Sequence, residues 1–346
     1  MATYGRTQEI AHEIGAGGRF TLRVTGPEVE LRAVRGTRAV VRVRFELRAS
    51  SEEEADELFE RVRFRAREGE GLLEVDEPRN DSGGIGALVR LFGSGRVASN
   101  ISINAEIPAG ADLTYEGVSA DVTAAGFTGT QQYRTVSGDL VLDRVAGNLR
   151  VRGVSSDVSI RAEDAVRLEM NSVSGDISAV APRFDAMRIV TVSGDIELDG
   201  ALPAGSQHRI ETVSGDLVLG TVGGVTVEVR GLSSDTHVSV PHRAEGSRDR
   251  RRYVIGGGEA HLAFSSMSGD VSVDASRRLS APIAPTPPTP PTPPTPPTAP
   301  TSTVPPAPPR APLADDEQLA ILRALEDGEI DIEEAASRLA GGPTDA

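Results

Sequence analysis

The chain has 346 residues and no cysteine, and all 36 of its basic residues are arginine. These absences exclude disulfides, thiolate catalysis and zinc ribbons, and also lysine-dependent chemistry such as a Schiff base or a Walker-type phosphate loop. The net charge of −15 and the aromatic content of 3% argue against a nucleic-acid-binding protein, which needs a basic surface and stacking side chains.

The N-terminal segment has no apolar stretch long enough for a signal peptide. No window of the sequence approaches the roughly 20 apolar residues of a membrane-spanning helix. We therefore expect a cytoplasmic protein, and association with a membrane surface stays open. The missing cysteine fits this location, although it would also suit an exported protein.

Residues 1–110 are predicted to form β-strands. Apolar side chains such as Phe20, Leu22 and Val24 alternate with polar ones, which is the pattern of half-buried strands with one solvent-facing, arginine-rich face. Ser51 is followed by three glutamates, a pattern that is typical of a helix start.

A glycine-rich loop is predicted over residues 80–99, and it carries one short apolar run, Ile85–Phe92. We favour a role for this run in capping the open end of the β-structure, because an uncovered end is an aggregation hazard. Contact with a membrane is the alternative. Leu91 and Phe92 are the candidate interaction residues in this run.

The strongest signal is an internal repeat of a tetrapeptide with the form apolar–Ser–small–Asp. Eight copies occur, and the separations between successive aspartates are 18, 18, 19, 19, 21, 19 and 35 residues. A fixed period near 19 indicates that one supersecondary unit is stacked repeatedly on itself. The aspartates are Asp121, Asp139, Asp157, Asp176, Asp195, Asp216, Asp235 and Asp270.

Each repeat carries two short β-runs and no helical pattern. Residues 111–280 therefore predict an all-β fold, a β-helix-like β-solenoid with coils of about 19 residues that continues the N-terminal strands. The alternation places Val136 and Leu140 in an aliphatic core, with Ser137 and Asp139 outside. The last gap of 35 residues is predicted to hold one degenerate repeat.

The aspartate never varies among the copies, whereas the position before it is Gly in five, Ser in two and Ala in one. We favour a structural role, in which each aspartate bonds backbone N–H groups at a corner of the coil. Binding of Ca²⁺ by the stacked carboxylates is the alternative, but the Gly-Gly-x-Gly-x-Asp pattern of calcium-binding β-rolls is absent. The variation among small residues indicates a steric limit.

An arginine cluster interrupts the repeat before its last copy and predicts a protruding loop. The simpler interpretation is a solvated turn. The alternative is a docking site for an anionic surface, including the chain's own acidic tail. The candidate interaction residues are Arg248, Arg250, Arg251 and Arg252.

The alternating strands, the turn formed by Ile107, Pro108 and Gly110, and the serial VSGD repeats together resemble a bacterial β-strand-repeat family of unknown function, often labelled "putative adhesin". The resemblance covers roughly residues 20–274. The label implies a function at the cell surface, which the lack of an export signal does not favour.

A proline-rich linker is predicted over residues 281–312, which hold 16 of the 23 prolines. Such a segment favours extended polyproline II and acts as a semi-rigid spacer, with a reach of roughly 100 Å at about 3.1 Å per residue. Recognition by a proline-binding domain is the alternative.

Residues 313–346 predict two short helices, and they carry ten acidic residues against two arginines. Leu322 and Leu325 lie on one face of the first helix, which Gly328 ends. The pattern resembles short helical SHOCT-like domains, which accompany strand-repeat domains in some bacterial envelope-stress proteins. Because so short a segment buries little surface alone, we expect it to self-associate or to dock on a protein partner.

Motifs for catalysis and for metal binding are missing from the sequence. There is no nucleophile elbow, no histidine pair at metal-ligand spacing, and almost no aromatic platform for a sugar. We therefore expect no enzyme, no cofactor and no bound metal.

The predicted function is a non-enzymatic repeat scaffold for protein interactions, which the resemblances link to cell-envelope sensing or assembly in bacteria. An adhesin-like protein that binds a surface or a polysaccharide is the alternative, and a solenoid hydrolase comes third. The expected partners are proteins, or a second copy through the C-terminal helices. Nucleic acid is not expected, and a membrane contact is not favoured.

Overall fold

The computed structural model describes residues 2–78, 98–233, 235–247 and 250–276. These residues belong to the first of two compact units, Met1–Ala284. The proline-rich linker, the predicted C-terminal helices and the apolar run Ile85–Phe92 lie outside the described residues.

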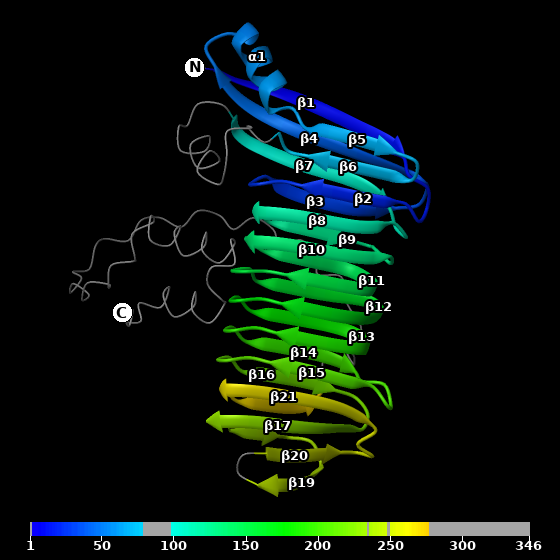
Figure 1. Ribbon diagram of the computed structural model, residues 1–346, viewed down its shortest axis with the longest axis vertical. Coiled ribbons are helices and arrows are strands. Elements are labelled where there is room, and N and C mark those ends of the chain that lie inside the picture. Colours follow the sequence, from blue (N-terminus) through cyan, green and yellow to red (C-terminus); the bar gives the residue numbers. More distant parts are fainter. Residues whose placement is uncertain (1, 79–97, 234, 248–249, 277–346) are drawn as a thin grey trace, which may run out of the picture. The chain divides into compact units, whose positions relative to one another are not determined.

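The described chain winds into a β-solenoid in which each turn, or coil, contributes one strand to each of two parallel-stranded faces (Figure 1). The predicted all-β solenoid fold is confirmed. We call the two sides the arginine face and the groove face, after the exposed arginines of the one and the shallow groove on the other.

The arginine face consists, in spatial order, of β6 (Leu72–Asp76), β2 (Arg19–Arg23), β8 (Asp112–Ser119), β10 (Thr130–Ser137), the C-terminal halves of β11 (Leu140–Arg152), β12 (Val158–Asn171) and β13 (Ile177–Val190), then β15 (Gln207–Glu211), β21 (Ala260–Ser268) and β17 (Val225–Ser233).

The groove face consists, in the same order, of β7 (Ala98–Pro108), β3 (Glu28–Val34), β9 (Val122–Ala125), the N-terminal halves of β11, β12 and β13, then β14 (Ile196–Ala201), β16 (Leu217–Thr221), β22 (Val271–Ala275) and β18 (Thr236–Val238).

The core lies between the two faces and consists of aliphatic columns. Equivalent positions of successive coils are register partners, so that one column contains Leu140, Val158, Ile177, Ile196 and Leu217, all buried. Alternation along each strand sends every second side chain into this space, as the sequence predicts. The few aromatic residues are mostly used here too: the largest fully buried side chains include Tyr115, Tyr133, Phe20, Phe45, Phe127, Phe184 and Phe264.

The first residue of the tetrapeptide departs from the predicted alternation. The sequence pattern places Val136 in the core beside Leu140, but Val136 is 40% exposed, whereas Leu140 is 2% exposed. Val213 and Met267 are exposed in the same way. The expectation is wrong because the tetrapeptide is the corner between the two faces, and strict alternation ends where a strand ends.

At the N-terminal end, antiparallel strands and a helix cover the last coil. On the groove face β4 (Arg38–Ala49) pairs with β7 and β1 (Ala2–Glu13) pairs with β4, while on the arginine face β5 (Arg65–Gly69) pairs with β6. Helix α1 (Glu52–Val62) begins at the predicted cap, where the Ser51 side chain accepts from the N–H of Glu54, and it buries Ala55 and Leu58. None of the described helical structure is long and apolar enough to span a membrane.

At the C-terminal end, two antiparallel strands extend the arginine face at its open edge. Strand β20 (Arg250–Ile255) pairs antiparallel with β17 and with β19 (His242–Ser247). This hairpin corrects two expectations at once, the protruding arginine loop and the degenerate repeat in the last gap. Both expectations are wrong because the alternating residues of β19 and β20 form two strands, and β20 pairs with the open edge of β17.

The coils do not stack in chain order at either end. Near the N-terminus the coil of β2 and β3 lies between the coil of β6 and β7 and the coil of β8 and β9. Near the C-terminus the coil of β21 and β22 lies between the coil of β15 and β16 and the coil of β17 and β18, as Figure 1 shows for β21. The last tetrapeptide in the sequence is therefore not the last in space.

Candidate functional site

The tetrapeptides lie along one edge of the solenoid, which we call the aspartate edge. There the chain passes from the arginine face to the groove face, and equivalent serines of neighbouring coils pair, as Ser137 does with Ser155. All eight aspartates are exposed. Their spatial order follows the coils: Asp121, Asp139, Asp157, Asp176, Asp195, Asp216, Asp270 and Asp235.

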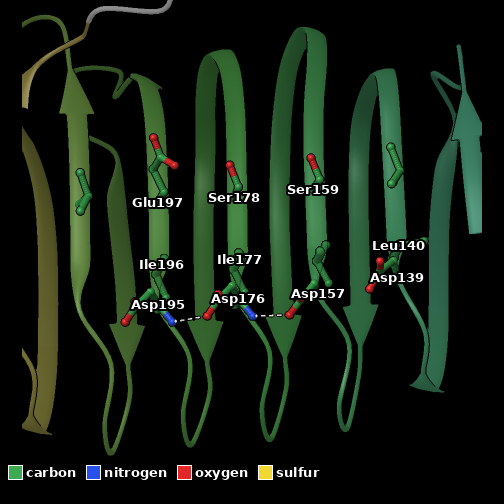
Figure 2. A pocket seen from close by; sticks show the side chains of 13 residues that line it. Asp139, Leu140, Asp157, Ser159, Asp176, Ile177, Ser178, Asp195, Ile196 and Glu197 are labelled. Atoms are coloured by element: carbon green, nitrogen blue, oxygen red, sulfur yellow. Dashed lines mark hydrogen bonds between the residues drawn. The ribbon is translucent and has the colours of Figure 1, made fainter. Parts of the chain in front are cut away.

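Most aspartates on this edge accept a hydrogen bond from the backbone of the next aspartate. In the two bonds drawn in Figure 2, the N–H of Asp195 donates to Oδ1 of Asp176, and the N–H of Asp176 donates to Oδ1 of Asp157, at 2.9 and 2.8 Å. The same bond joins Asp139 to Asp121, Asp216 to Asp195, Asp270 to Asp216 and Asp235 to Asp270, at 2.8 to 3.0 Å.

These bonds give each of the accepting carboxylates a partner in the adjacent coil. A hydrogen bond to a carboxylate is charge-assisted, so it offsets part of the repulsion between carboxylates that are one strand spacing apart. Among the described residues, no group of three or more His, Asp or Glu side chains is arranged to hold a metal ion. Through the hydrogen bonds the carboxylates join the corner backbones of adjacent coils.

The corner has two backbone forms. Where the small residue is Gly, φ is positive, between +99° at Gly138 and +155° at Gly269. Ala120 and Ser156, which replace it in two copies, are not among the residues with positive φ. An added Cβ at Gly194 would lie 2.2 Å from the carbonyl oxygen of Gly175 in the neighbouring coil. The predicted steric limit and a local need for positive φ therefore both act at the glycine corners.

A shallow groove of about 390 Å³ lies on the groove face beside the aspartate edge (Figure 2). It crosses neighbouring strands of successive coils and extends from β11 to β16. One side is formed by Asp139, Asp157, Asp176 and Asp195. The outward side chains beside them, two residues further along each strand, are Val141, Ser159, Ser178, Glu197 and Val218.

The groove presents hydroxyls and carboxylates from equivalent positions of successive coils. Hydroxyls of Ser159 and Ser178 point outward from adjacent coils, and no histidine lines the groove. His208, by contrast, is buried in the core, where its Nε2 lies 2.6 Å from Oγ of Ser206. The arrangement suits an extended ligand that lies across several coils, because each coil presents the same two positions.

The other predicted interaction residues are not brought to this groove. Arg251 and Arg252 lie in β20, in the C-terminal hairpin, and Arg250 begins the same strand. Arg248, Leu91, Phe92, Leu322 and Leu325 lie outside the described residues.

The outward positions of the groove face were not identified from the sequence, although a signal for them exists. Each lies two residues after a repeat aspartate, as Ser159 does after Asp157. Aligning the repeats on their aspartates would have collected these positions in one column. Their types differ from coil to coil, so composition alone does not mark them.

Comparison with known proteins gives one family. A family model described as "Toastrack DUF4097" matches residues 27–274 of the chain. No curated protein matches it.

The chain is also similar to solved bacterial structures. One is a "putative adhesin" from Bacteroides fragilis, with 12% identity and a TM-score of 0.33, covering 77% of this chain and 97% of that one. Another is a "Putative lipid binding protein" from Parabacteroides distasonis, with 10% identity and a TM-score of 0.39, covering 78% and 96%. A third is a "putative cell adhesion protein" from Clostridium sporogenes, with 8% identity and a TM-score of 0.24, covering 78% and 100%.

Proposed function

The chain belongs to the Toastrack DUF4097 family, and we propose on this basis that it is a non-enzymatic scaffold that binds protein partners along its repeated surfaces. The observation that carries the proposal is the groove beside the aspartate edge. Its lining comes from the same repeat positions in successive coils, from β11 to β16. A catalytic site needs groups that converge on one reacting atom, whereas the lining of this groove comes from the same positions of successive coils, set along a line.

The ligand that fits such a surface is an extended chain. It would contact uncharged side chains such as Ser159 and Ser178, with the repeat aspartates along one side and the carboxylate of Glu197 in the outward row. A protein segment with polar or basic side chains at regular intervals satisfies both conditions. We further propose that the bacterial process served is sensing or assembly at the cell envelope, with the C-terminal segment as a second contact for partners or for another copy.

An adhesin-like role is the second candidate. The hydroxyls and carboxylates at regular spacing in the groove favour it, since a polysaccharide is also an extended ligand and its hydroxyls bond both groups. The absence of aromatic side chains from the groove lining weighs toward protein.

The test is capture of crosslinked partners from native cells by the tagged full-length chain. The groove variant is Ser159→Arg with Ser178→Arg, and its matched control is Asn148→Arg with Asn171→Arg on the opposite face. We expect protein partners with the wild type and the control but not with the groove variant, while circular dichroism stays unchanged in all three. Fractionation of the same cells tests the expected cytoplasmic location.

Capture of the same proteins by the groove variant would contradict the proposal. Retention of purified cell-surface polysaccharide by the wild type and the control, with no protein dependent on the groove, would support the adhesin-like role instead. A third arm, the chain lacking residues 313–346, measures how much of the capture depends on the C-terminal segment.

A further inference from the structure

Four strands of the described chain, β1, β5, β18 and β19, have a pairing partner on one side only, and β1 is the longest of them. It has 12 residues and pairs with β4 over its whole length, and Figure 1 shows it beyond β4 at this end of the solenoid. The other three have 5, 3 and 6 residues. Natural proteins keep unpaired strand edges short or charged, so a long open edge indicates a surface that another strand covers.

The open edge of β1 presents hydrogen-bonding groups at regular intervals. The N–H of Ile14 donates to the carbonyl oxygen of Thr37 at 2.9 Å, and this pair continues the register of β1 and β4. Because bonded pairs in an antiparallel ladder occur at every second residue, the even-numbered residues of β1 bond to β4. The N–H and C=O groups of the odd-numbered residues therefore point to the open edge. They are Thr3, Gly5, Thr7, Glu9, Ala11 and Glu13.

The inward side chains of β1 hold this edge in place. The amide of Gln8, which is 8% exposed, donates to the carbonyl oxygen of Phe64 at 2.9 Å and accepts from the N–H of Phe64 at 2.8 Å. Nε2 of His12 lies 2.7 Å from the carbonyl oxygen of Gly69. A strand that is fixed in this way loses little conformational freedom when another strand pairs with it.

The two halves of β1 have neighbours of opposite charge. The first half lies beside α1, where Arg6 contacts Asp56 at 2.7 Å and Glu52 at 3.5 Å. This helix has six acidic residues and one arginine. The second half lies beside β5, which has two arginines and one glutamate, through the contact of His12 with Gly69. An antiparallel copy of β1 would thus bring the acidic neighbourhood of one chain to the basic neighbourhood of the other.

From this geometry we propose that the open edge of β1 is the docking site of β1 of a second copy of the chain. The two strands run antiparallel about a two-fold axis at Thr7, so that Thr7 lies opposite Thr7 of the second copy. Gly5 then lies opposite Glu9, and Thr3 lies opposite Ala11. These pairs supply about ten backbone hydrogen bonds. Among the described residues of β1, no two like charges lie directly opposite each other.

The register follows from the side chains of β1. A shift of two residues in one direction would place Arg6 opposite Arg6 of the second copy, and the same shift in the other direction would place Arg6 opposite the apolar Ile10. A shift by one residue would set inward side chains against outward ones. The two-fold pairing closes after two copies, because each chain has one such edge.

This contact would join two groove faces into one continuous sheet, with both grooves on the same side. The groove extends from β11 to β16 and shares no residue with β1. The proposal therefore goes beyond the scaffold function and does not rest on it.

The test is disulfide crosslinking of the full-length chain, which has no native cysteine. In Thr7→Cys the two Cα atoms would lie about 5.5 Å apart, as in any bonded antiparallel pair, which is within the range of a disulfide. The matched control is Thr3→Cys on the same edge, whose two copies would lie roughly 27 Å apart along the strands.

We expect Thr7→Cys to form a disulfide-linked dimer roughly 100-fold faster than Thr3→Cys at micromolar concentration, because strand pairing raises the effective concentration of one thiol at the other. Sedimentation should give a dimer for the wild type. Thr7→Glu sets two carboxylates opposite each other and should shift the chain toward the monomer, with circular dichroism unchanged. The matched control Thr123→Glu, which changes an exposed residue of β9, should stay dimeric.

Equal crosslinking rates for Thr7→Cys and Thr3→Cys would overturn the proposal, and so would a wild-type chain that sediments as a monomer. A dimer that Thr7→Glu leaves intact and Thr7→Cys does not crosslink would mean that the copies meet elsewhere, which also overturns it. The crosslinking arm does not depend on the folding of Thr7→Glu. None of these results involves the groove, so this proposal and the proposed function fail separately.

Discussion

At the scale of single residues, His208 is an ionisable side chain that is buried between apolar neighbours. It is the register partner of Met187 on one side and Leu262 on the other, and it is 3% exposed. Its Nε2 bonds Oγ of Ser206, but its Nδ1 has no partner among the described residues. Burial lowers the pKa of His208 to about 4. The ring is therefore neutral at neutral pH, and protonation favours the unfolded chain.

This residue predicts an acid-dependent loss of stability. Below the unfolded-state pKa of about 6.5 the unfolded chain binds a proton that the folded chain does not, so the free energy of unfolding falls as the pH falls from about 6.5 toward 4. The expected loss is about 1.4 kcal/mol per pH unit, or about 3 kcal/mol by pH 4.

The measurement is urea unfolding at several pH values, for the wild type and for His208→Leu, which matches the aliphatic column. We expect the difference between the two proteins to grow steadily in this window and to be constant above pH 7. Parallel pH profiles for the two proteins would show that His208 does not titrate between the folded and unfolded states.

At the scale of the element, the glycine corner determines how closely two coils approach. Gly194 has φ of +114°, and a Cβ added to it would lie 2.2 Å from the carbonyl oxygen of Gly175 in the neighbouring coil. Gly205 also has a positive φ, +76°, but nothing would lie within 4 Å of an added Cβ there. Substitutions at the two glycines therefore distinguish the cost of backbone strain from the cost of a clash between neighbouring coils.

We predict that Gly194→Ala destabilises the protein more than Gly205→Ala. The first substitution adds strain and a clash with a backbone carbonyl, for a loss of about 3 kcal/mol, and the second adds strain alone, for about 1 kcal/mol. The midpoint of urea denaturation, followed by circular dichroism, measures both. Equal losses would mean that the corner relaxes around the new methyl group.

The sequence predicts much of this element because the repeat is visible in it. The invariant aspartates and the alternation after them were sufficient for the two-strand coil, the buried positions such as Leu140, and the outward carboxylates. Val136 could not be placed correctly, because alternation gives no sign of where a strand ends and a corner begins. The groove was missed because its lining side chains, such as Val141 and Ser159, share a position in the repeat but not a residue type.

At the scale of the whole described unit, the order of coils is the feature that the sequence does not contain. The copy with Asp270 matches the others, so nothing in its residues places it before Asp235 in space. Its position follows from the hairpin of β19 and β20, which returns the chain to the gap beside β15. The terminal coil of β17 and β18 thus takes its parallel partners from strands that come later in the chain.

We therefore predict that removing residues 256–346 exposes the terminal coil. Strands β17 and β18 would lose β21 and β22, and the amide hydrogens within residues 225–238 that bond to those two strands would exchange rapidly, while β17 keeps β20 on its other side. The control is the chain that ends at Ser276, which keeps every described strand and should protect these amides as the full chain does. Full protection in the shorter chain would mean that the terminal coil can pair directly with β15 and β16.

The interlocked ends have a consequence for how such a molecule changes length. At each end, neighbouring coils come from segments that are not consecutive in the chain. A coil added or lost there would therefore separate strands that pair with each other. The units between β10 and β14 have no such restriction, because each contacts only the unit before and the unit after it. Duplication of one central unit would lengthen the solenoid by one strand spacing, about 4.8 Å. Length is thus adjustable in fixed steps in the middle of the molecule, while its two ends stay constant.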